Sequence, residues 1–109
     1  MTKSAAKTKS GAVAKTKTVA YDVSAHLRTP EEMAAYLDAW LDEAPDDAAG
    51  ISRALGDIAR AKGMSQVARD AGLSRESLYK ALGENGNPSF ATVLKVVRAL
   101  GVRFHAAPA

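Results

Sequence analysis

The fold of this 109-residue chain is most constrained by residues 64–82, which read MSQVARDAGLSRESLYKAL. The small residue Ala68 stands four positions before Gly72, as a close helix crossing followed by a tight turn requires. Leu73 follows the glycine and can pack its apolar side chain beneath the turn. The spacing therefore predicts one short helix over about 65–71, then a turn, and a second helix directly after it.

The second helix is predicted over about 75–82. Ser74 is a favourable N-cap, because its hydroxyl can accept a hydrogen bond from an otherwise unpaired N–H of the first turn. Leu78 and Leu82 stand four apart on the side of the helix that would face a core. This combination predicts a helix-turn-helix, a unit that places its second helix in the major groove of DNA.

The outer face of this second helix carries Arg75, Glu76, Ser77 and Lys80, all of which can hydrogen-bond base edges or phosphates. Arg75 has the planar fork that matches O6 and N7 of guanine, whereas Glu76 can accept from N4 of cytosine. Lys80 lies one turn beyond Glu76 on the same face. The alternative for these two residues is an ordinary surface ion pair.

Composition leaves room for one small domain and excludes several kinds of site. The chain has no cysteine, which excludes disulfides, thiolate zinc fingers and cysteine nucleophiles. Its two histidines are too few for a histidine-rich metal cage, and it has no glycine-rich phosphate loop or nucleophile–base constellation. We therefore expect no enzyme activity, no metal and no cofactor. With no secretory signal and no run of about 20 apolar residues, a soluble cytoplasmic protein without a membrane partner is expected.

Three segments of the chain differ sharply in charge. Residues 1–20 carry five lysines and no acid, residues 21–47 carry eight acids against one arginine, and residues 48–109 carry nine Lys or Arg against four acids. A basic C-terminal body suits a polyanion such as DNA, and the acidic middle suits a different partner. The alternative for the acidic run is a merely solvated face.

These shifts divide the chain into a Lys-rich tail at 1–20, an acidic amphipathic segment at 21–45 and a helix-turn-helix domain at 46–109. The tail is low in complexity and has little to bury, so we expect it to be disordered. It either adds nonspecific attraction to phosphates or serves only as a solubilising tail. Residues 21–27 are expected to form a short extended segment.

The acidic segment predicts an amphipathic helix over 30–43. Thr29 is its cap, Pro30 suits the first helical position, Glu32 completes a capping box, and Pro45 limits the far end. Its apolar side repeats at i, i+3, i+4, i+7 and i+8 with Met33, Tyr36, Leu37, Trp40 and Leu41, and its other side carries Glu32, Asp38, Asp42 and Glu43. Core packing and binding of a partner are both open for the apolar side.

Two more helices frame the motif. Asp46 or Asp47 caps a helix over about 47–62, whose inward residues are Ile51, Leu55 and Ile58. A last helix runs from its Ser89 cap to Gly101, with the apolar stripe Phe90, Val93, Leu94, Val97 and Leu100. The apolar–polar alternation at 102–105 is compatible with a short C-terminal strand. The pattern therefore predicts an all-α fold with five helices, with that strand as an option.

Residues 47–104 resemble the Cro/C1-type, Xre-like domain of lambda repressor-like DNA-binding proteins. The match rests on GLSRESLYKAL (72–82), NGNPS (85–89) and VVRALGV (96–102). Together with Tyr21-Asp22, the 29–43 segment and LGDIARA at 55–61, the chain more narrowly resembles the HigA-like addiction-module antidotes over about 85 residues. The resemblance implies a five-helix DNA-binding domain preceded by an extra N-terminal helix.

The chain departs from the family pattern in the first motif helix. In the family, a glutamine that binds a DNA phosphate commonly stands four residues before the small residue, which is Ala68 in this chain. Here that position is Met64. Gln66 stands only two residues before Ala68, so the helix looks about two residues shorter. The phosphate role is therefore not transferred to Gln66.

The second motif helix aligns with the family without gaps. The resemblance places its base-reading positions on Arg75, Glu76 and Lys80, and its phosphate contacts on Ser74 and Ser77, of which Ser74 also serves as a cap. Tyr79 is a further candidate for the phosphates, with packing on the domain as its alternative.

The resemblance also implies a function. It is that of a DNA-binding antitoxin of a type II toxin–antitoxin module, which represses its own operon and neutralises a basic, RelE/HigB-like toxin that cleaves messenger RNA. Such a protein works in the bacterial cytoplasm and joins the nucleoid when bound to DNA. We expect a homodimer on a palindromic operator, joined through the last helix with 102–104 or through the helix at 30–43.

The acidic helix is the expected toxin-binding element, through Met33, Tyr36, Asp38, Trp40 and Asp42. Two other binding functions stay open. A stand-alone Xre/Cro-type repressor would share the DNA motif without needing an acidic helix. A histone-like protein would use the lysine tail and show no preference for an operator.

Overall fold

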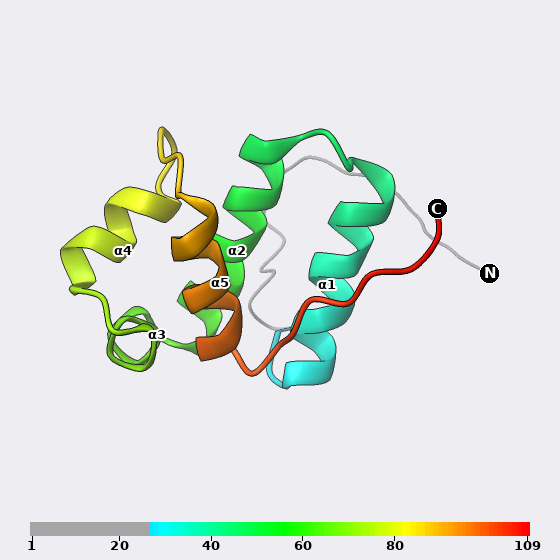
Figure 1. Ribbon diagram of the computed structural model, residues 1–109. Helices are drawn as coiled ribbons and strands as arrows, with labels where there is room; N and C mark the ends of the chain where they lie inside the picture. The colour runs from blue at the N-terminus through cyan, green and yellow to red at the C-terminus, as the bar shows by residue number, and fades with distance from the viewer. Residues whose placement is uncertain (1–26) are drawn as a thin grey trace, which may run out of the picture.

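The computed structural model describes residues 27–109, and this part of the chain contains helices only. The five helices are α1 (Pro30–Glu43), α2 (Ala48–Lys62), α3 (Met64–Ala71), α4 (Arg75–Leu82) and α5 (Phe90–Ala99) (Figure 1). The all-α class is thus confirmed for the described residues. The predictions for the tail at 1–20 and for the segment at 21–26 lie outside them.

The five helices that the sequence pattern predicts are confirmed, but two other expectations about the architecture are wrong. The resemblance implied five helices after an extra N-terminal one, but α1 is itself one of the five helices in the described residues. Residues 102–105 do not form the optional strand. A strand needs a partner strand for its backbone hydrogen bonds, and residues 27–109 contain none.

Local sequence explains where α1 and α2 begin. The Thr29 hydroxyl accepts a hydrogen bond from the Glu32 N–H at 3.1 Å, and the Glu32 carboxylate accepts from the Thr29 N–H at 3.0 Å. This is the predicted capping box. Asp47 rather than Asp46 caps α2, with its carboxylate accepting from the Gly50 N–H at 2.9 Å.

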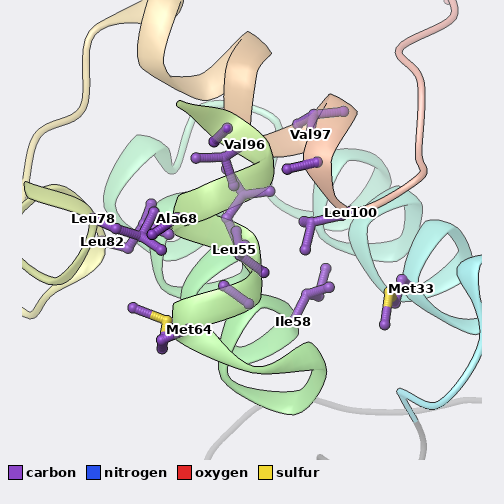
Figure 2. Packing of buried hydrophobic residues seen from close by; sticks show 14 of the residues in the cluster. Met33, Leu55, Ile58, Met64, Ala68, Leu78, Leu82, Val96, Val97 and Leu100 are labelled. Carbon is purple, nitrogen blue, oxygen red and sulfur yellow. The ribbon is translucent and has the colours of Figure 1, made fainter. Parts of the chain in front are cut away.

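Helix α2 lies at the centre of the fold and packs against each of the other four helices. Figure 2 shows Leu55 and Ile58 of α2 in the middle of the core, with Leu78 and Leu82 of α4 on one side and Leu100 on the other. Helix α1 packs chiefly on α2, whereas α3 and α4 also pack on each other. The sequence thus builds one core around α2 and places α1 and α4 at its two ends (Figure 1).

The predicted inner stripe of α5 is partly wrong. Val97 and Leu100 are buried and Val93 is half-buried, but Phe90 is 70% exposed and Leu94 is 45% exposed. Val96 and Ala99 are buried in their place, because α3 and α2 cover a side of α5 that is turned away from Phe90 and Leu94. The helix is apolar on more than one side, so its periodicity alone did not identify the buried side.

Candidate functional site: two exposed helical faces

The turn between α3 and α4 has the geometry that its sequence predicts. Gly72 adopts a left-handed conformation, with φ of 72°, which favours glycine. The Leu73 N–H donates to the Ala68 carbonyl at 2.9 Å, and Leu73 packs partly buried against the core. The three residues 72–74 therefore connect α3 to α4.

Helix α4 is anchored by its apolar side and exposes its polar side. Leu78 and Leu82 are buried in the core, whereas Arg75, Glu76, Ser77 and Lys80 are all exposed. Ser74 caps the helix, since its hydroxyl oxygen accepts from the Ser77 N–H at 3.0 Å. The same hydroxyl lies 2.8 Å from that of Ser77, so the two serines form one polar group at the start of α4.

The charged residues of α4 are not paired with one another. In residues 27–109 the one ion pair joins Arg60 to Asp57 on α2, at 3.1 Å. The predicted alternative, a surface ion pair between Glu76 and Lys80, is therefore not observed. Both side chains keep their charge available to an incoming ligand.

Arg75 instead contacts an aromatic residue one turn further along α4. Its Nη2 donates to the Tyr79 hydroxyl at 3.1 Å, and its guanidinium carbon lies 5.2 Å from the centroid of the Tyr79 ring. Tyr79 is 43% exposed. This pair was not predicted from the sequence, although residues at i and i+4 are neighbours on a helix surface.

The first motif helix is short, as the position of Met64 indicated. It has eight residues, and only Gly63 separates it from the end of α2. Met64 is buried in the core, and Gln66 donates to the Asp70 carboxylate at 2.9 Å. Gln66 also accepts from Arg69 at 2.9 Å. The Gln66 side chain is thus bonded along its own helix.

The apolar side of α1 belongs largely to the core. Met33 is 4% exposed and Leu37 is buried, so the candidate toxin contact at Met33 is not at the surface. Tyr36 is half-buried, and its hydroxyl donates to the Asp57 carboxylate of α2 at 3.0 Å. Trp40 is also half-buried and lies over Gly50, where an added Cβ would stand only 2.5 Å from the indole ring.

The outer side of α1 remains acidic and exposed. It carries Glu31, Asp38, Asp42 and Glu43, and none of these is in an ion pair within the described chain. Helices α1 and α4 lie at opposite ends of the molecule, so these acids are on a helix remote from α4 (Figure 1). The pKa of Glu32, at the start of α1, is lowered by a hydrogen bond from the Arg28 N–H to its carboxylate.

Other kinds of site find no support in residues 27–109. No cluster of three or more His, Cys, Asp or Glu there could hold a metal ion. None of the five helices is long and apolar enough to cross a membrane.

Fold and surfaces together define a small all-α protein with two separate exposed polar faces. Residues 17–108 match the family model described as probable addiction module antidote protein. An uncharacterized protein of Haemophilus influenzae is 57% identical over 84 residues, which cover 77% of this chain and 84% of that relative. No solved structure matches the chain. The chain therefore belongs to the probable addiction module antidote family, and antidotes of this kind imply a cognate toxin as partner.

Proposed function

We propose that this protein is the antitoxin of a type II toxin–antitoxin module that represses its own operon and neutralises a RelE/HigB-like, mRNA-cleaving toxin. The family membership supports the antidote role. The exposed face of α4, whose charged residues make no ion pair, is the observation that carries the DNA-binding role. The protein acts by binding in the bacterial cytoplasm, and catalysis has no part in this function.

In this proposal α3 and α4 form a Cro/C1-type helix-turn-helix, and α4 enters the major groove of the operator. Arg75, Glu76 and Lys80 face the base edges, with the Arg75 fork directed at O6 and N7 of a guanine. Ser74 and Ser77 lie beside the phosphates at the start of α4, joined by Tyr79. One such helix makes few base contacts, so a homodimer on a palindromic operator supplies the rest.

The outer face of α1 is the proposed toxin-binding surface. Asp38 and Asp42 supply negative charge for a basic toxin, and the exposed edge of Trp40 supplies apolar area. Tyr36 contributes only the part of its ring that α2 leaves uncovered, and Met33 has no part because it is buried.

Two measurements on the intact chain test this function. The chain is co-expressed with the product of the adjacent gene, and the pair is purified through a tag on that product. We expect a stable complex and restored growth of cells that express the toxin.

The purified chain should also shift DNA from upstream of its own gene in the presence of excess random DNA. A chain that shifts the upstream DNA but has no toxin partner is a stand-alone repressor. Equal binding to all DNA would instead indicate a histone-like protein.

A further inference from the structure

We propose that Tyr79 is a positioning residue for base recognition, which holds the Arg75 guanidinium in place on the outer face of α4 before DNA is bound. This inference rests on the proposed DNA-binding function of α4. It assigns to Tyr79 an effect on specificity that acts through Arg75, in addition to any contact with the DNA backbone.

Two contacts restrain the same guanidinium. The hydrogen bond from Nη2 to the Tyr79 hydroxyl fixes the tip of the arginine, and the ring beneath it supplies a cation–π contact. No carboxylate in residues 27–109 pairs with Arg75. The nearest acid in sequence, Glu76, is exposed on the same helix and makes no ion pair.

A tyrosine is a suitable partner for an arginine that must still read a base. The guanidinium has five N–H donors, and the phenol oxygen accepts only one of them. A pair of donors therefore remains for O6 and N7 of guanine. A carboxylate could take up two of these donors and would repel the phosphates, whereas the phenol oxygen takes up only one donor and brings no carboxylate charge.

The Tyr79 hydroxyl also keeps its own proton while it accepts from Arg75. It can therefore donate to a phosphate oxygen at the same time. The core does not explain the position of Tyr79, because Leu78 and Leu82 fill the inner side of α4 while Tyr79 lies largely at the surface.

Holding Arg75 in advance lowers the entropy lost when it binds, since an arginine side chain has many rotamers to lose. That gain applies only to DNA that offers a guanine to Arg75. A phosphate contact from the hydroxyl would strengthen binding to every sequence equally. The two effects of Tyr79 are therefore separable by comparing two DNA sequences.

The base pair read by Arg75 is first identified as the operator position at which Arg75→Ala no longer prefers one base pair over the others. Affinity is then measured for the operator and for a variant operator in which that base pair is replaced. The ratio of the two affinities is compared in wild type, Tyr79→Phe, Tyr79→Leu, Arg75→Ala and the Arg75→Ala/Tyr79→Leu double variant. Arg53→Ala, at an exposed arginine of α2 outside the helix-turn-helix, is the control.

We expect Tyr79→Leu to lower this ratio about two- to fivefold, the range expected of an exposed cation–π contact. Tyr79→Phe keeps the ring and should lower the ratio less, while weakening binding to both DNA sequences through loss of the hydroxyl. Tyr79→Leu should not change the ratio further once Arg75 is alanine, and Arg53→Ala should not change it at all.

NMR of the Arg75 side chain in the free protein provides a readout that needs no DNA. We expect its Nε–H group to be more mobile in Tyr79→Leu than in wild type. Equal mobility in both proteins would overturn the proposal, as would a Tyr79→Leu variant that weakens binding to both DNA sequences equally. Failure of the wild type to prefer its operator over random DNA would overturn the DNA-binding function itself, and this role with it.

Discussion

Helices α1 and α4 are both amphipathic and both pack on α2, yet their exposed faces are organised in different ways. The outer face of α4 combines two cations, an acid and hydroxyl groups, and its arginine is hydrogen-bonded to Tyr79. The charged residues on the outer face of α1 are all acids, and none of them is in an ion pair in the described chain. A mixed, partly ordered face suits recognition of a particular base sequence, whereas a face of one charge suits a basic protein surface.

The two helices also differ in how they are held. Helix α4 packs on both α2 and α3, whereas α1 packs chiefly on α2. Their inner residues nevertheless belong to one continuous core that includes Met33 and Leu37 of α1 and Leu78 of α4. The molecule therefore presents two different surfaces from one folded unit. Because removal of α1 would uncover α2, point variants on its outer face are the sharper test of its role.

The largest expected effects come from truncating the anchors of the two helices. Leu78→Ala and Leu37→Ala each remove a buried side chain, and each should lower the free energy of unfolding by about 2–5 kcal/mol. Chemical denaturation followed by circular dichroism and by the fluorescence of Trp40, the only tryptophan, measures both. The two probes should report one transition. A Trp40 transition that precedes the loss of helix in Leu37→Ala would show that α1 is a separate unit.

A smaller effect is expected where α1 crosses the start of α2. In Gly50→Ala the new Cβ would meet both the Asp47 carboxylate that caps α2 and the ring of Trp40, so these groups must move. We expect a loss of about 1–3 kcal/mol in the free energy of unfolding and a change in the Trp40 emission maximum. The exposed neighbour Ala49→Ser provides a matched control. An unchanged emission spectrum in Gly50→Ala would contradict the packing of Trp40 on α2.

The smallest effect concerns pH and the start of α1. The lowered pKa of Glu32 means that its carboxylate is favoured in the folded chain by the N–H groups of Arg28 and Thr29. This stabilisation is present above the ordinary pKa of about 4.5 and is lost as the pH falls through the folded value. Between pH 6 and pH 3, wild type should therefore lose slightly more stability than Glu32→Gln. Identical pH profiles, measured by thermal unfolding, would rule out this contribution.

Local signals in the sequence predicted much of the fold. The bounds of α1 and α4 agree with the structure, because a capping box, Pro30 and Pro45 define the first and the Ser74 cap defines the second. The exposure of Arg75, Glu76 and Lys80 followed from the spacing of Leu78 and Leu82. Their binding to DNA remains a prediction.

Features that depend on tertiary packing were not predicted. Phe90 and Leu94 were placed in the core because α5 is apolar on more than one side, and only α2 and α3 determine which side is covered. The strand at 102–105 failed because alternation cannot supply a partner strand. Met33 lies on a stripe that suits core packing as well as partner binding, and the structure buries it.

The central claim is that α4 recognises DNA and α1 recognises the toxin as two independent faces. The direct measurement compares Arg75→Ala with the double variant Asp38→Asn/Asp42→Asn for affinity to operator DNA and to the toxin. We predict that Arg75→Ala loses about 1–3 kcal/mol of operator binding and keeps toxin affinity, whereas the double variant does the reverse. Loss of both affinities in either variant, with the fold intact by circular dichroism, would contradict the separation of the two faces.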